Sequence, residues 1–169
     1  LFEEGIKRGY GAKDSVGGAW NETFVPWKFV DDAPVTPAST TISFEFWENK
    51  PDYVVEWKYD SSKNIYLRFN GGKAHTDMDN EAPQLSAKNV VFQFVTEKGP
   101  VDEESHIYYE NIGKGKALYF MNGQVQTGTW ARPKLTDRTV FYDQKGQEIL
   151  FVRGVVWIEA VPSGNTISY

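Results

Sequence analysis

The chain of 169 residues carries 18 Lys and Arg against 23 Asp and Glu, which gives a net charge of −5 at pH 7. It contains no Cys, so disulfides, thiolate metal sites and cysteine nucleophiles are excluded. The acidic balance argues against unspecific binding to nucleic acid or to an anionic membrane surface. A single domain is the expectation at this length, and 6 Trp, 9 Tyr and 11 Phe supply ample apolar surface for its core.

The first forty residues predict an irregular arm that packs on the rest of the molecule. Residues 1–9 could form one short helix, which Gly5 weakens and Gly9 would end. Glycines and prolines then interrupt the segment, but Trp20, Phe24, Trp27 and Phe29 are too many large rings for a solvated linker. The chain starts at Leu rather than Met, so we expect a preceding segment.

After residue 40 the hydrophobic pattern changes to a period of two, which is typical of strands with one face on a core. Ten short strands are expected, at 42–46, 53–59, 65–69, 88–95, 105–111, 116–121, 124–131, 139–142, 148–152 and 155–161. In the third of these, the odd-numbered residues from Ile65 to Phe69 are predicted to face the core. Residues 88–95 are apolar on both faces and are expected to be central, and Asn122-Gly123 predicts a tight hairpin.

This pattern predicts an all-β fold of mostly antiparallel strands, arranged as a sandwich or a partly open barrel. The strands fall into a first group within 41–97 and a second group within 101–169, on either side of Lys98-Gly99-Pro100. No linker-like composition surrounds this break. We therefore expect one compact unit over 1–169, with at most one short helix.

Several motifs of the last seventy residues resemble one known family. They are Gly113-x-Gly115-Lys116-Ala117, Asn122-Gly123, Gly128-Thr129-Trp130-x-Arg132, Phe141-Tyr142-Asp143-x-x-Gly146 and Gly154-x-x-Trp157-Ile158. The chain resembles the C-terminal domain of the YerB-like lipoproteins, a bacterial family of unknown function. Arg68-Phe69-Asn70-Gly71, His75-x-Asp77, Lys88-Asn89-Val90-Val91 and Trp27-x-Phe29 extend the similarity toward the N-terminus. The resemblance implies an extracytoplasmic location, tethered to the membrane through a lipid-anchored N-terminal part that this chain lacks. It implies no catalytic residues.

Few residues could supply chemistry, because the chain has two His and no Cys. His75 and Asp77 could share one side of an extended segment, where the carboxylate would orient the imidazole and Arg68 would hold an anion. A hydrogen-bonded cluster that fixes a loop is the favoured interpretation. The acidic segment Asp77–Glu81 lacks the spacing of an EF-hand, so a solvated turn is favoured over a cation site. Gly113-x-Gly115 is followed by a strand pattern, which disfavours a phosphate-binding loop.

We therefore expect no catalytic residue, no metal and no cofactor, and we interpret the chain as a non-catalytic binding module. Its predicted ligand-binding residues are Arg68, His75, Asp77, Trp130 and Arg132, and its expected partner is a protein or a cell-wall glycan. Trp47, Tyr66 and Tyr108 are further rings expected to face outward, although core packing is the simpler interpretation for Trp130. Two alternatives stay open: a hydrolase acting on cell-envelope polymers, and a purely structural domain that supports the preceding one.

Overall fold

The computed structural model describes residues 7, 25–34, 36–37, 40–79 and 83–169. The all-β prediction is confirmed, since the described residues form thirteen strands and one short 3-10 helix, η1 (Pro51–Tyr53). The helix predicted over 1–9 and the rings Trp20 and Phe24 lie outside the described residues, apart from Lys7. Among the residues that the structure describes, no helix is long and apolar enough to cross a membrane.

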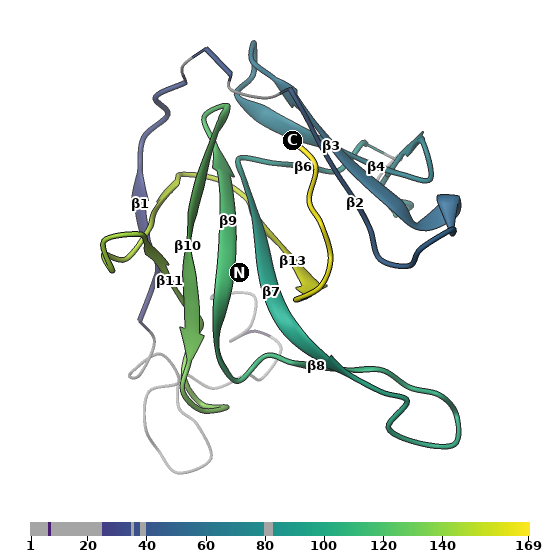
Figure 1. Ribbon diagram of the computed structural model, residues 1–169. Helices are drawn as coiled ribbons and strands as arrows, with labels where there is room; N and C mark the ends of the chain where they lie inside the picture. Colours follow the sequence, from purple (N-terminus) through teal and green to yellow (C-terminus); the bar gives the residue numbers. More distant parts are fainter. Residues whose placement is uncertain (1–6, 8–24, 35, 38–39, 80–82) are drawn as a thin grey trace.

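Two sheets dominate the structure (Figure 1). The larger sheet has five strands in spatial order, which are β11 (Val140–Asp143), β10 (Gln124–Arg132), β9 (Gly113–Met121), β7 (Asn89–Lys98) and β13 (Val156–Pro162). Its sixth strand, β8 (Tyr108–Glu110), pairs with the far end of β7. Neighbouring strands run antiparallel except β7 and β13, which are parallel.

The smaller sheet is antiparallel and packs against one face of the larger sheet. Its strands are β2 (Thr41–Glu45), β3 (Val54–Asp60), β4 (Ile65–Asn70), β5 (Lys73–Ala74) and β6 (Ser86–Ala87). A separate parallel pair joins β1 (Lys28–Val30), within the arm, to β12 (Leu150–Val152). The N-terminal arm is thus fixed in part by strand pairing, which the sequence pattern did not indicate.

Strand β7 is covered on both faces, as the apolar residues on both faces of its middle predicted. Val90 and Phe92 lie in the core between the two sheets, whereas Val91 and Val95 lie in a second core on the opposite face. That second core is closed by residues of β11 and β12 and by the arm residue Trp27, whose indole nitrogen donates to Thr139 O at 2.8 Å. The molecule therefore has two apolar layers with the larger sheet between them.

The predicted orientation of β4 was wrong. Tyr66 and Arg68 are 1% and 6% exposed and face the core, while Ile65, Leu67 and Phe69 are only half-buried. The polar ends of the two buried side chains find partners there. Tyr66 accepts a hydrogen bond from the amide of Gly123, and Arg68 forms an ion pair that is described below. Tyr66 is consequently not an outward-facing ring.

Other predicted elements differ in extent. The Asn122-Gly123 hairpin is confirmed, with φ values of 52° and 77° that match a tight two-residue turn. The strand expected at 105–111 is reduced to β8. The break at Lys98-Gly99-Pro100 is the start of the β7–β8 hairpin loop (residues 99–107), which projects from the sheets in Figure 1.

Candidate functional site

The most distinctive irregularity of the larger sheet lies where β7 separates from β9. Pairing between these strands stops at Gln93 and Ala117, and β7 next pairs with β8 at Thr96 and Glu110. Two residues of β7 therefore lie opposite six residues, 111–116, of the β8–β9 segment. This interruption of the ladder is an irregular bulge, larger than the single extra residue of a common β-bulge, and bulges are frequent next to active sites.

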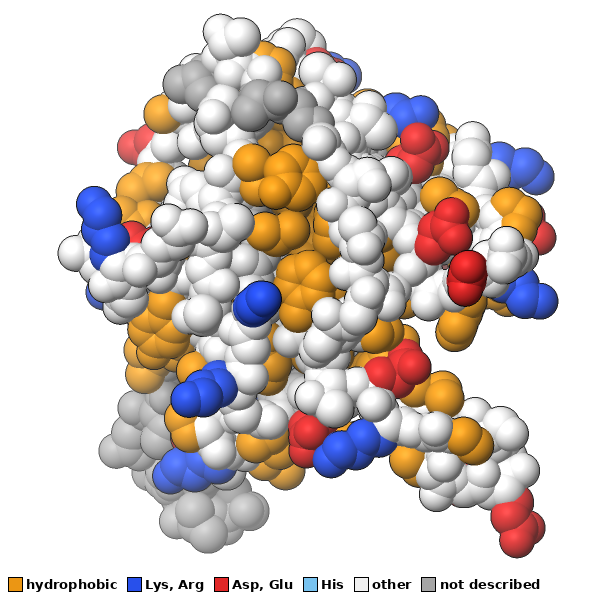
Figure 2. All heavy atoms as spheres, viewed as in Figure 1, with side chains coloured by type: hydrophobic (Ala, Val, Ile, Leu, Met, Phe, Trp, Pro, Cys, Tyr) orange, Lys and Arg blue, Asp and Glu red, His pale blue; other side chains and the backbone are white. Residues whose placement is uncertain are grey.

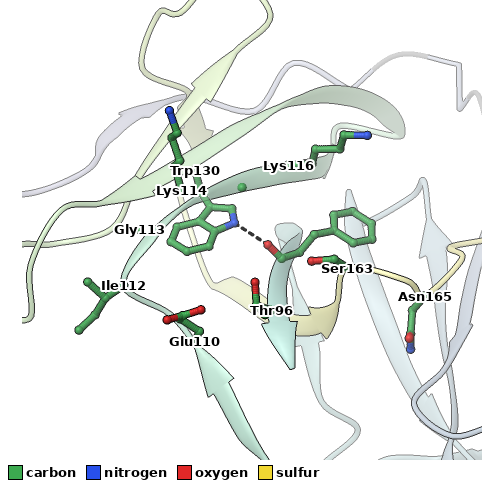
Figure 3. A pocket seen from close by; sticks show the side chains of 11 residues that line it. Thr96, Glu110, Ile112, Gly113, Lys114, Lys116, Trp130, Ser163 and Asn165 are labelled. Carbon is green, nitrogen blue, oxygen red and sulfur yellow. Dashed lines mark hydrogen bonds between the residues drawn. The ribbon is translucent and has the colours of Figure 1, made fainter. Parts of the chain in front are cut away.

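A cavity of about 760 Å³, the β7–β9 pocket, opens at this bulge. Its size is within the range of small-ligand sites in proteins, roughly 300–1,000 Å³. The lining residues come from β7, from the bulge, from β10 and from the segment after β13, and they are Phe94, Thr96, Glu110, Ile112, Gly113, Lys114, Gly115, Lys116, Trp130, Ser163 and Asn165. Figure 3 shows most of these side chains around the opening, with Trp130 between the bulge and β7.

Trp130 closes the gap that the bulge leaves in the sheet. Its indole Nε1 donates to the backbone oxygen of Phe94 at 2.8 Å, which satisfies a carbonyl that β9 no longer reaches (Figure 3). Gly115 makes this contact possible, because a Cβ there would lie 2.5 Å from Phe94 O and 2.6 Å from Trp130 Nε1. Trp130 is only 2% exposed, so its ring is a structural floor with no free face for stacking.

The pocket carries two positive charges without an ion-pair partner among the described residues, whereas its one negative charge is paired. Lys114 and Lys116 are exposed, share one face of β9, and form no ion pair with any described residue. Glu110 is the one carboxylate among the lining residues, and it is paired with Lys98 Nζ at 3.0 Å. Figure 2 shows Lys and Arg side chains over the lower parts of β9 and β10 in the same view. The bulge is thus locally cationic on an acidic protein.

Arg132 lies two residues beyond Trp130 on β10 but is not among the pocket residues. Its guanidinium donates to the carbonyl oxygens of Asp137 at 2.9 Å and Leu135 at 2.7 Å. It therefore fixes the loop between β10 and β11. Its predicted role in ligand binding stays a prediction, and the bonds seen here are intramolecular.

Arg68 belongs to a second polar cluster, which is buried between the two sheets. Its Nε lies 3.0 Å from Glu159 Oε1, and the two side chains are 7% and 6% exposed. The guanidinium also lies 5.8 Å from the ring centre of Trp57 and 5.2 Å from that of Trp157. Trp57 Nε1 donates to the same Glu159 oxygen at 3.2 Å. The positive charge is thus neutralised inside the protein.

Glu159 was missed as the partner of Arg68. One signal was present in the sequence, since a carboxylate interrupts the apolar strand 155–161 at a position that faces the core. Charged residues are almost never fully buried without a partner. The identity of that partner, 91 residues earlier in the chain, depends on how the two sheets pack.

His75 contacts Arg68, as the sequence suggested, because Arg68 Nη1 bonds with His75 Nδ1. Partial burial and the neighbouring guanidinium lower the pKa of His75 from its ordinary value, although Glu159 opposes this shift. Asp77 accepts a hydrogen bond from the amide of Asp79 at 3.0 Å, which is an Asx turn. Within the described residues no group of three or more His, Cys, Asp or Glu could hold a metal ion, and 80–82 of the acidic segment lie outside them.

The five predicted binding residues therefore do not converge on one place. Trp130 lies at the pocket, Arg132 fixes a loop, Arg68 and His75 bond with each other in the second polar cluster, and Asp77 forms an Asx turn with Asp79. The remaining outward-ring candidates, Trp47 and Tyr108, are 48% and 47% exposed.

Comparison with known proteins identifies the family. Residues 42–158 match the family described as "Protein of unknown function (DUF3048) C-terminal domain". The chain belongs to this family. Over 139 residues it is 26% identical to "Putative lipoprotein YerB" of Bacillus subtilis (strain 168), which confirms the resemblance to YerB-like lipoproteins.

The fold is shared with a solved structure. The crystal structure of YerB protein from Bacillus subtilis matches 99% of this chain with a TM-score of 0.71 at 22% identity. The chain spans 40% of the curated relative's length, or 52% of the crystallised chain. At this level of identity the structural match shows the common fold alone.

Proposed function

We propose that this domain is a non-catalytic binding module of an extracytoplasmic, lipid-anchored envelope protein, and that it binds its ligand in the β7–β9 pocket. The observation that carries the proposal is the wide bulge between β7 and β9, which opens a cavity of about 760 Å³ in an otherwise regular sheet. A concave site of this size favours a small or chain-like ligand such as a cell-wall glycan over a flat protein surface.

The groups around the pocket favour binding over catalysis. Most glycosidases hydrolyse the glycosidic bond with two carboxyl groups across the cleft. Among the lining residues Glu110 is the single carboxylate, and it is paired with Lys98. Neither histidine of the chain lines this pocket. The hydrolase alternative would need its acid and base from elsewhere.

The other polar cluster supports the same proposal. Arg68 bonds with both Glu159 and His75, and the Arg68–Glu159 pair is buried between the two sheets, where little room is left for a substrate. The location and the anchor follow from the relative's description as a lipoprotein, and they are part of the proposal for this chain.

The proposal is tested by filling the pocket. Thr96 is an exposed lining residue whose side chain makes no hydrogen bond with a described residue, so Thr96→Trp is expected to occupy the cavity without removing a contact. The matched control is Ser61→Trp in the exposed turn between β3 and β4. We expect Thr96→Trp to lose binding to solubilised peptidoglycan fragments in equilibrium dialysis, while Ser61→Trp binds like wild type.

Equal binding by wild type and Thr96→Trp would exclude the pocket as the site. Release of new reducing ends or free amino groups from the same fragments would favour the hydrolase alternative. If no fragment binds wild type, the structural alternative or a protein partner would replace the proposal.

A further inference from the structure

We infer that the β7–β9 pocket recognises an anionic, hydroxyl-bearing saccharide, with its acidic group at Lys114 and Lys116. The inference rests on the proposed function and specifies the ligand class of that site. It follows from two walls of the pocket that differ in charge and in hydrogen-bonding capacity.

The first wall is cationic. Lys114 and Lys116 alternate with Gly113 and Gly115, so no other side chain of this stretch of β9 shields the two ammonium groups. They form no ion pair within the described residues, and the charge of Glu110 is compensated by Lys98 at 3.0 Å. On a chain with a net charge of −5, two uncompensated cations at one cavity favour an anion there.

The opposite wall offers acceptors. Ser163 Oγ donates to Val95 O at 2.8 Å, and Asn165 Nδ2 donates to Glu45 O at 2.6 Å. Each side chain therefore donates one hydrogen bond to a backbone oxygen of the protein. The Ser163 hydroxyl oxygen and the Asn165 amide oxygen can still accept a hydrogen bond from a ligand. Figure 3 shows both side chains on the side of the opening away from Glu110 and Ile112.

The floor contributes apolar contact but no free donor. The one indole donor among the described lining residues, Trp130 Nε1, is occupied by Phe94 O, and the half-buried ring of Phe94 packs against the core between the sheets. A ligand that fits these walls carries a negative group at one end, hydroxyl donors at the other, and an apolar ring face between them. Sugars that bear a carboxylate or a phosphate have this combination of groups.

The class is tested by calorimetric titration of the intact domain with three probes. Trigalacturonic acid supplies carboxylates, glucose 6-phosphate supplies a phosphate, and maltotriose is neutral. We expect one of the two acidic probes to bind, with an affinity that falls as salt is raised, and maltotriose to bind at least about tenfold more weakly. The acidic probe that binds distinguishes the carboxylate from the phosphate as the recognised group.

Two double variants, each of which removes two positive charges, complete the test. Lys114→Gln/Lys116→Gln is expected to weaken binding of the acidic probe about tenfold or more, whereas Lys73→Gln/Lys145→Gln, exposed and outside this pocket, is expected to leave it unchanged. The inference would be overturned if both variants weakened binding equally, or if maltotriose bound as tightly as the acidic probes. It would also be overturned if neither acidic probe bound. If Thr96→Trp blocks peptidoglycan fragments while the Lys114/Lys116 variant does not, the binding site stands and only its anionic ligand class fails.

Discussion

Removing either member of the Arg68–Glu159 pair is expected to destabilise the domain strongly. The charged atoms are 3.0 Å apart, and both side chains are less than a tenth exposed. At this distance and an effective dielectric constant of ~20, their attraction is about 5.5 kcal/mol, much of which offsets the cost of desolvating both ions. Breaking such a pair leaves one buried charge alone and costs about 3–5 kcal/mol.

Glu159→Leu would leave the guanidinium of Arg68 beside two indole rings, and Arg68→Met would leave the carboxylate with Trp57 Nε1 as its one side-chain donor among the described residues. We expect each single variant to lose about 3–5 kcal/mol in urea unfolding followed by far-UV circular dichroism. The double variant is expected to be more stable than either single variant, because no unpaired charge remains.

The exposed pair Arg153–Asp31 is the control, since its side chains are 68% and 89% exposed. Arg153→Met is expected to change the free energy of unfolding by about 0.5 kcal/mol or less. A loss below about 1 kcal/mol for both single variants in the buried pair would contradict a structural role for this cluster. It would return Arg68 to the list of groups available for ligand binding.

Two further predictions concern the bulge and the partly buried His75. Gly115→Ala places a methyl group against the Trp130–Phe94 hydrogen bond and is expected to lower the free energy of unfolding by about 1–3 kcal/mol in the same assay. The control Gly164→Ala has open space around the new methyl group and is expected to lower it little. Equal stability of the two variants would contradict the packing described at the bulge. Because the pKa of His75 is lowered in the folded protein, the unfolded chain binds more protons near pH 6.5, so stability is expected to fall as pH decreases from about 7.5 to about 5.5. His75→Gln should flatten this slope relative to wild type, and an unchanged slope in His75→Gln would show that His75 is not its cause.

The fold class and the positions of most strands along the chain follow from local sequence. Alternating apolar residues predicted β2 and β3 with the correct face inward, and the long apolar run of β7 predicted its central place. The Asn122-Gly123 turn is likewise encoded by two residues that adopt positive φ. These are properties of short segments, which is why a single sequence reveals them.

The remaining features depend on contacts distant in sequence. On β4, alternation alone placed Arg68 and Tyr66 outside, but Glu159 and Gly123 supply their partners from 91 and 57 residues away. The pairing of β1 with β12 is equally remote in sequence. The β7–β9 pocket could not be predicted either, because it results from the register of β7 against two successive strands.

The most direct test of the central claim is a map of amide chemical shifts in the domain during titration with solubilised peptidoglycan fragments. The account predicts that the shifts concentrate at residues 94–96, 110–116 and 163–165, with little change around Arg68 and His75. Shifts centred on the Arg68–Glu159 cluster, or the absence of any shift at the β7–β9 pocket while the fragments bind, would contradict it.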